Sequence, residues 1–333
     1  MTSRVTMQQA DSGQEIPAFE LLRPVGEIAP VIFASPHSGH YYPETFQALL
    51  RVPLMDLRRT EDAFVDGLFG SASDAGAVQI NGRYGRCYVD LNRDPRELDA
   101  QMFVDAPPRT SGRASPRVRA GLGCLPKIGA SGADIYNQLL TATDVRSRLE
   151  QVHDIYHRQI KSEIEIFKQD WQDVFLIDCH SMPSHAAGRG ALPDIVLGDR
   201  FGSSCDRRLT SLVERTLRGF GYSVVRNAPF AGGYTTQQYG RPARHVHALQ
   251  IEINRHIYMC EDNITKLPRF ETLKSDMTAL VHAINQFARA PTQKKAALKS
   301  AAEKVREETP EGVSTNVQDL LIVRRTKGKV KHR

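Results

Sequence analysis

The sequence VIFASPHSGHYYP, residues 31–43, joins an apolar run to a pair of histidines. Val31–Ala34 has the length and composition of a buried strand, and His37 and His40 follow it in a segment that contains Pro and Gly. Ligands of open α/β sheets bind beyond the carboxyl ends of the strands. The two imidazoles are therefore candidates for metal ligands or for a catalytic base, and turn residues without chemistry are the alternative.

Other apolar runs of strand length alternate with segments of helical periodicity. The predicted strands are 77–80, 86–91, 174–178, 194–199, 222–229 and 247–254, and the predicted helices are 62–76, 138–170 (one helix or two) and 211–222. Strands that alternate with helices, several of them wholly apolar, indicate a sheet covered on both faces. We therefore expect an α/β protein with a mixed, mostly parallel sheet sandwiched by helices.

Polar residues stand at the ends of several predicted strands. Asn92 and Arg93 follow the third strand, His180 follows the fourth, and Glu252 lies among isoleucines in the last. Each has an ordinary alternative: a turn histidine, a helix cap with a surface ion pair, or the outward residue of an edge strand. Their combination matches zinc catalysis, which uses His and carboxylate ligands together with a separate carboxylate as base.

The net charge of +6 is concentrated at one end of the 333-residue chain. Residues 291–333 contain eleven Lys or Arg against five Asp or Glu, so the remaining 290 residues carry 33 of each sign. Equal numbers of positive and negative residues in this part of the chain do not indicate a nucleic-acid-binding surface. We expect a basic, flexible, solvated tail at 291–333; contact of its end with RNA or anionic lipid is the alternative.

The chain carries no apolar run of 18 residues and no apolar stretch near its start, so we expect neither a membrane span nor a signal peptide. Its five cysteines are scattered and never spaced C-x-x-C, as in a reduced cytoplasmic protein. The Gly/Pro-rich, basic segment 107–132 is typical of a loop that covers a site.

Six short motifs together resemble the N-formylglutamate amidohydrolase family. They are PHSG (36–39), TED (60–62), YVDLNRDP (88–95), DCHSM (178–182), GGY (232–234) and IEINRHIYM (251–259). The resemblance runs from about residue 28 to about residue 285, in order. It implies a zinc-carboxypeptidase-like fold. It also implies three parts: an N-terminal extension at 1–27, an amidohydrolase domain at 28–290 and the tail.

The resemblance implies a metal site formed by His37, Asp62 and His180, with zinc as the expected ion. For the third ligand, Glu61, His40 and Glu44 stay open beside Asp62. Asp62 has a further alternative as the N-cap of the helix that follows it.

The same resemblance gives Glu252 the role of general base and assigns the binding of substrate carboxylates to polar residues nearby. These are Asn92 and Arg93, with Arg86 and then Arg255 as the second cation, and Tyr234 at the rim of the site. The expected reaction is hydrolysis of N-formyl-L-glutamate to formate and glutamate. Another N-acyl amino acid or a small peptide is the nearer alternative, and a non-catalytic binding protein that uses the basic tail is the farther one. The oligomeric state stays open.

Overall fold

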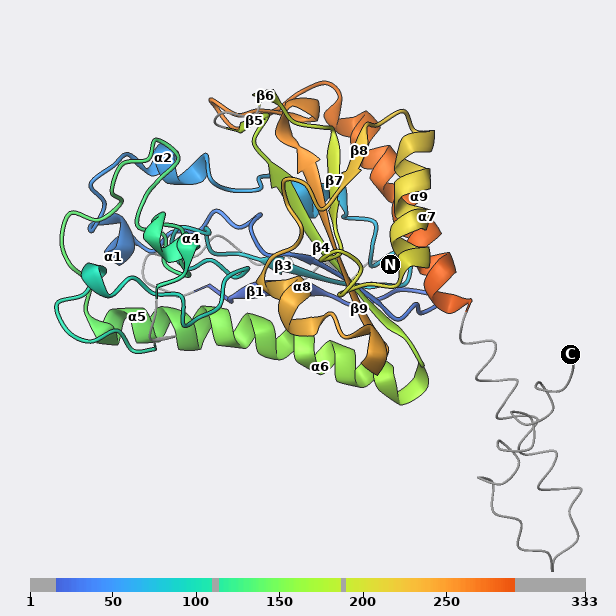
Figure 1. Ribbon diagram of the computed structural model, residues 1–333, viewed down its shortest axis with the longest axis horizontal. Helices are drawn as coiled ribbons and strands as arrows, with labels where there is room; N and C mark the ends of the chain where they lie inside the picture. The colour runs from blue at the N-terminus through green and yellow to red at the C-terminus, as the bar shows by residue number, and fades with distance from the viewer. Residues whose placement is uncertain (1–15, 110–113, 187–189, 291–333) are drawn as a thin grey trace, which may run out of the picture. The chain divides into compact units, whose positions relative to one another are not determined.

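A seven-stranded sheet forms the centre of the structure, a computed structural model that describes residues 16–109, 114–186 and 190–290 (Figure 1). In spatial order its strands are β1 (Phe19–Leu22), β3 (Val78–Gly82), β2 (Val31–Ser35), β4 (Val174–Met182), β9 (Val246–Asn254), β7 (Ile195–Gly198) and β8 (Val224–Arg226). Strands β3, β2, β4 and β9 run parallel, whereas β1 and β7 pair antiparallel with β3 and β9. The predicted mixed, mostly parallel sheet is confirmed.

Helices cover both faces of this sheet (Figure 1). Residues of α5 and α6 pack in the core on one face, and residues of α3, α7 and α9 in the core on the other. The helices of the described residues are α1 (Glu44–Gln47), α2 (Leu54–Arg58), α3 (Val65–Leu68), α4 (Pro116–Arg119), α5 (Ala142–Arg148), α6 (Asp154–Asp170), α7 (Arg207–Gly219), α8 (Tyr234–Tyr239) and α9 (Phe270–Arg289). Shorter elements are the 3-10 turns η1 (Ala100–Met102), η3 (Pro242–Arg244) and η4 (Arg255–Ile257), the π-helical segment η2 (Leu149–His153), and the two-residue strands β5 (His185–Ala186), β6 (Gly190–Ala191), β10 (Met259–Cys260) and β11 (Thr265–Lys266).

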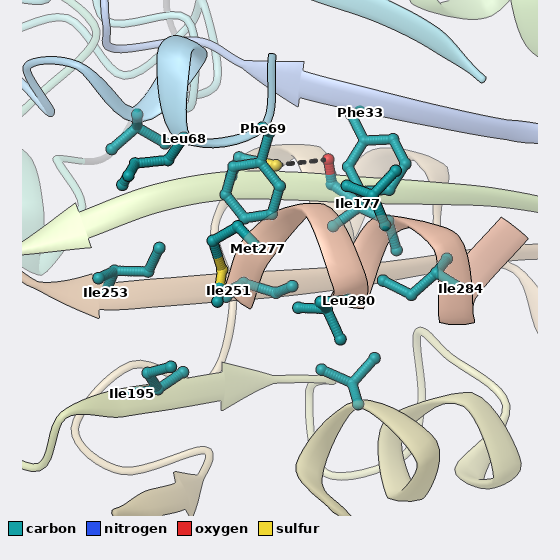
Figure 2. Close-up of a cluster of buried hydrophobic side chains, with 14 of the residues drawn as sticks. Phe33, Leu68, Phe69, Ile177, Ile195, Ile251, Ile253, Met277, Leu280 and Ile284 are labelled. Atoms are coloured by element: carbon teal, nitrogen blue, oxygen red, sulfur yellow. Dashed lines mark hydrogen bonds between the residues drawn. The ribbon is translucent and has the colours of Figure 1, made fainter. Parts of the chain in front are cut away.

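The alternation of side chains along each strand divides the interior into two cores. On β2, Val31 and Phe33 belong to the core between the sheet and helices α3, α7 and α9 (Figure 2). Ile32 and Ala34 belong to the core under α5, η2 and α6. Strands that are apolar on both faces need helices on both faces, and this is why the predicted sandwich forms.

The segment 86–91, predicted as a strand, is not one. Tyr88 N–H donates to Gly85 O at 2.9 Å in a turn, and Asp90 N–H donates to Cys124 O at 2.7 Å. Val89 is buried in the core under α6. The apolar pattern therefore reports burial correctly, but the backbone pairs with a loop instead of the sheet.

Two predicted helices also differ from the prediction. The run 62–76 contains only the short helix α3 followed by turns, since Phe64 has a left-handed φ of 68° and Gly76 has φ of 96°. The predicted helix 138–170 starts at Ala142, and α5, η2 and α6 follow one another without a break.

Strand β1 lies inside the predicted N-terminal extension, yet it forms the edge of the sheet beside β3. The chain divides into two units, Met1–Pro291 and Thr292–Arg333. The predicted tail lies outside the described residues. Within the described ranges, none of the helices combines the length and apolarity needed to cross a bilayer.

Candidate metal centre

Strands β4 and β9 present four polar side chains on one face of the sheet, near its carboxyl edge. In the parallel pairing of these strands, Asp178 is level with Gln250 and His180 is level with Glu252. The intervening Ile251 faces the core under α7 and α9. His180 and Glu252 are therefore cross-strand neighbours that share the opposite face. His180 lies within β4, which extends to Met182, and not after the strand as predicted.

His37 and Asp62 approach this face from loops. His37 lies two residues beyond β2, and its carbonyl accepts a hydrogen bond from Asp62 N–H at 3.0 Å. Ser38 Oγ donates to Asp62 O at 3.1 Å. Gly39 lets the same loop pack against the backbone of Arg83, because a Cβ there would lie 2.3 Å from the carbonyl carbon of Arg83.

The side chains of His37, Asp62 and His180 meet in a buried group. Asp62 Oδ2 lies 3.3 Å from His37 Nδ1 and 2.9 Å from His180 Nδ1. Their three possible ligand atoms all lie within 4.8 Å of one another, and no member is more than 3% exposed. Two imidazoles and a carboxylate form a donor set that suits zinc.

Each imidazole has a second carboxylate at its other nitrogen. His37 Nε2 lies 2.7 Å from Asp90 Oδ1, and His180 Nε2 lies 3.1 Å from Asp178 Oδ1. In metal sites such carboxylates fix the tautomer, so that the free nitrogen faces the ion. Within residues 16–109, 114–186 and 190–290, the buried His37 Nδ1 has no hydrogen-bond partner, as a nitrogen reserved for a ligand would have none. The group therefore fits a divalent metal ion.

The carboxylates of this group are held in their charged form. Burial acts to raise the pKa of Asp62, but the hydrogen bond to His180 and the neighbouring His37 hold it well below its usual value. Burial acts on Asp90 in the same way, and the charges of His37, Arg86 and Arg93 hold its pKa well below the usual value. Ionised carboxylates and imidazole nitrogens are what a cation binds.

The alternatives for the third ligand lie elsewhere. Glu61 is buried but accepts a hydrogen bond from Tyr42 Oη at 2.9 Å, and burial raises the pKa of Glu61 to about 7. His40 and Glu44 are exposed. Asp62 is not the N-cap of α3, because Phe64 occupies that position.

Glu252 lies beside the buried group with its carboxylate nearly enclosed. It is 8% exposed, and its Oε1 accepts a hydrogen bond from Gln250 Nε2 at 2.7 Å. Burial raises the pKa of Glu252 to about 7, against the opposing charge of His180. A carboxylate poised near neutral pH suits proton transfer.

Asn92 connects the group to two neighbouring elements. Its Nδ2 lies 2.9 Å from His180 Nε2 and 3.3 Å from Asp178 Oδ2, and its Oδ1 accepts a hydrogen bond from Thr235 N–H at 2.8 Å. Gly233 permits this, since a Cβ there would lie 2.3 Å from Asn92 Nδ2. Asn92 thus contacts His180 directly.

The three predicted arginines differ in how they are engaged. Arg86 Nη2 donates to Asp90 Oδ2 at 2.8 Å, and its side chain is 21% exposed. Arg93 donates through Nε to Leu122 O at 3.2 Å and through Nη1 to Asn92 O at 3.0 Å. Arg255 is 3% exposed. Its guanidinium donates to Asp62 Oδ1 at 3.0 Å and also contacts Ser181 Oγ, Arg59 O and Thr60 O.

Tyr234 opens α8 directly after Gly233 and is half-buried. Its N–H donates to Asn92 O at 3.3 Å. Its ring lies 5.1 Å from that of His157 and 5.9 Å from that of His153. The backbone of Tyr234 thus adjoins the group through Asn92.

Sequence reasoning did not single out Asp90, Asp178 or Gln250. A signal was available for Asp178 and Gln250, because each stands two residues before a predicted site residue on the same strand. Period-two alternation places such a pair on one face. Asp90 also stands two residues before a predicted site residue, Asn92, but strand alternation does not apply there, since its segment is not a strand.

The fold and the site define a class of α/β proteins with a candidate metal centre at the carboxyl edge of a mixed sheet. The family model of N-formylglutamate amidohydrolase matches residues 29–259, and the chain belongs to this family. The resemblance expected from the motifs is thereby confirmed.

Individual relatives agree with this assignment. The chain is 32% identical over 238 residues to the N-formylglutamate deformylases of Pseudomonas aeruginosa and Pseudomonas putida, which covers 70% of this chain and 83% and 82% of theirs. The crystal structure of N-formylglutamate amidohydrolase from Ralstonia eutropha JMP134 matches with a TM-score of 0.79 and 34% identity, over 83% of this chain and all of that one. A protein of Agrobacterium tumefaciens, 14% identical with a TM-score of 0.57 over 83% of this chain and 96% of that one, shares the fold alone.

Proposed function

We propose that this protein hydrolyses N-formyl-L-glutamate to formate and glutamate with the help of one divalent metal ion, zinc by preference. The observation that carries the proposal is the buried group of His37, Asp62 and His180 next to Glu252. The names of the 32% identical relatives favour N-formylglutamate over other N-acyl amino acids and peptides.

The proposed roles follow from the contacts. An ion held by His37 Nδ1, one Asp62 oxygen and His180 Nδ1 would polarise the formyl carbonyl and acidify a water molecule. Glu252 takes a proton from the attacking water and delivers it to the amide nitrogen as the C–N bond breaks. The oxygen of that water remains in formate, and the protonated nitrogen leaves with glutamate.

The two carboxylates of the substrate need cations, and Arg86 and Arg93 are the proposed partners. An arginine fork suits a carboxylate better than lysine does. Asn92 and Tyr234 complete the proposed binding site. The contacts of Arg255 favour a role in holding Asp62 rather than in contacting substrate.

We also propose that residues 28–290 form the catalytic domain, that 291–333 is an accessory tail, and that the protein acts in the cytoplasm. The likeness of this fold to that of the zinc carboxypeptidases is likewise a proposal.

A substrate panel with metal analysis tests the proposed function. The purified protein should contain close to one zinc per chain and prefer N-formyl-L-glutamate to N-acetyl-L-glutamate and to N-formyl-L-glutamine. A chelator should remove the activity, and zinc should restore it. A protein that binds zinc but acts on none of these compounds would contradict the assigned substrate, and activity that survives complete metal removal would contradict the assigned chemistry.

A further inference from the structure

Two histidines one helical turn apart lie at the junction of η2 and α6, in the sequence HDIYH (153–157). This spacing places both on one helix face, as in helical metal sites. Both rings instead contact main-chain oxygens: His153 Nε2 lies 2.9 Å from Arg93 O, and His157 Nε2 lies 2.8 Å from Leu91 O. Because a carbonyl oxygen only accepts, each imidazole donates through Nε2.

Both histidines are buried, so these carbonyl oxygens and not water accept the hydrogen bonds of their Nε2 atoms. His153 is 1% exposed; its Nδ1 lies 3.6 Å from Asp154 Oδ1 and has no hydrogen-bond partner in the part of the chain that the structure describes. His157 is 9% exposed, and its Nδ1 lies 3.0 Å from Tyr239 Oη. Burial lowers the pKa of His157 to about 3, so its ring is neutral at physiological pH. A neutral ring with Nε2 donating is a fixed support for the segment it contacts.

The residue between the two supported carbonyls is Asn92. Its side chain is 3% exposed and lies against His180 and Asp178, while its Oδ1 accepts from Thr235 N–H. The backbone of this short segment is thus fixed from the helix, and its side chain reaches the metal group. No strand ladder holds residues 91–93, since the predicted strand is absent. The hydrogen bonds of the two histidines to Leu91 O and Arg93 O hold this segment, together with Asn92 N–H to Asp90 Oδ1 at 2.9 Å and Tyr234 N–H to Asn92 O at 3.3 Å.

The π-helical segment separates two sets of contacts made by the same helical run, those of Arg148 and those of the histidines. A π turn closes its hydrogen bonds between residues five apart, and this one begins after Arg148 and ends at the first of the two histidines. The guanidinium of Arg148 is buried over three aromatic rings, those of Phe46, Tyr88 and Tyr136, at 5.0, 4.8 and 5.8 Å. Functional sites often lie beside such turns.

We infer that His153 and His157 are positioning residues, which hold the main chain on either side of Asn92 so that its amide keeps its hydrogen bond to Asp178, the carboxylate that orients His180. The inference goes beyond the proposed function. It rests on that proposal only for the presence of a metal ion, and not for the substrate. Its consequence is that residues outside the metal group set the affinity of that group for an ion.

Paired substitutions separate this role from simple packing. His157→Phe and His153→Phe keep a ring but remove the donor, whereas His157→Gln and His153→Gln retain an amide N–H in a similar place. Tyr239→Phe is the control, because it removes the hydroxyl at His157 Nδ1 and leaves the Nε2 contact. The affinity for zinc, measured by competition with a chelating dye, should fall about 3- to 10-fold in the Phe variants. It should stay within two-fold in the Gln variants and the control.

A double-mutant cycle with Asn92→Ala makes the test specific, since residues that act through one another do not add. In the Asn92→Ala background, His157→Phe should weaken zinc binding by less than two-fold. Full additivity would overturn the inference. If N-formyl-L-glutamate proves not to be a substrate, the proposed function fails, and the zinc cycle still decides this inference.

A metal-free readout covers the case in which zinc does not bind at all. The Thr235 amide donates to Asn92 Oδ1 and is buried, so its hydrogen exchange reports how firmly Asn92 is held. Exchange at Thr235 should accelerate at least five-fold in His157→Phe and stay unchanged in Tyr239→Phe. Equal acceleration throughout α6 and α8 would show general loosening and contradict a positioning role.

Discussion

At the scale of single residues, Asp62 is the centre of the candidate site. It faces both imidazoles through one oxygen, and Arg255 donates to the other at 3.0 Å. An ionised carboxylate in this position organises the histidines and receives its own counter-charge from Arg255. The resemblance of the sequence predicted Asp62 together with His37 and His180, but not the contact with Arg255, because contacts between residues distant in sequence depend on the fold.

The three proposed metal ligands should all be needed for zinc binding. Replacing His37, Asp62 or His180 with Ala should abolish stoichiometric zinc and hydrolysis together, since each variant lacks one of the three proposed ligands. Metal analysis of the purified variants measures this. His40→Ala is the matched control, because His40 is exposed, and it should keep both properties. Loss of metal in His40→Ala with retention in Asp62→Ala would reassign the third ligand.

Arg93 and Arg86 should discriminate between the two substrate carboxylates. A hydrogen-bonded pair with a charged group contributes about 1.5–3 kcal/mol, roughly 10- to 100-fold in kcat/KM. If Arg93 binds the α-carboxylate, Arg93→Ala should reduce kcat/KM equally for N-formyl-L-glutamate and N-formyl-L-glutamine, mainly through KM. Arg93→Lys should recover part of the loss.

Arg86→Ala is the complementary variant and should reduce the reaction of N-formyl-L-glutamate alone. Zinc content must be measured alongside, because Arg86 also contacts Asp90. If N-formyl-L-glutamine is insensitive to Arg93→Ala, the two assignments must be exchanged.

At the scale of elements, the pattern of apolar residues along the strands was enough to predict most of the sheet. The apolar runs 31–34 and 174–178 predicted β2 and β4, and the mixed run 247–254 predicted β9; His37, His180 and Glu252 lie in or just beyond the carboxyl halves of these strands. The segment 86–91 misled the prediction because its buried Val89 and Leu91 have the spacing of strand residues. Local pattern reports burial, whereas the partner of each backbone N–H is decided by the whole fold.

In the helical run α5–η2–α6, His157 should make the free energy of unfolding depend on pH. The pKa of His157 is lowered to about 3 by burial, whereas an unfolded histidine has a pKa of about 6.5. The unfolded state therefore binds more protons between these values, and the free energy of unfolding falls as pH decreases from 6.5 toward 3. The maximum slope for one group is about 1.4 kcal/mol per pH unit.

Urea unfolding at pH 7 and pH 4.5 tests this effect. Between these values wild type should lose about 2–3 kcal/mol more than His157→Gln, because the variant lacks that proton. Groups other than residue 157 titrate in both proteins and cancel in the comparison. Parallel losses in the two proteins would show that His157 is protonated in the folded state.

At the scale of the whole molecule, the site and the two cores that flank the sheet, as far as the structure describes them, use residues that precede 290. The core residues span Ala18 to Ala288, and the candidate site spans His37 to Arg255. Deleting 291–333 should therefore leave kcat/KM within a few-fold and the folded state intact. Circular dichroism and steady-state kinetics of the truncated protein check this. A collapse of either would show that the tail contributes to the core or to the site.

The central claim is that Glu252 acts as a base beside a metal held by His37, Asp62 and His180, and Glu252→Gln tests it most directly. Glutamine keeps the shape and can still hydrogen-bond to Gln250, but it cannot take a proton. Zinc content and KM for N-formyl-L-glutamate should stay near wild type, while kcat falls by roughly 10²–10⁴, the usual scale of general acid–base catalysis. Near-normal turnover by Glu252→Gln with its metal in place would contradict the mechanism.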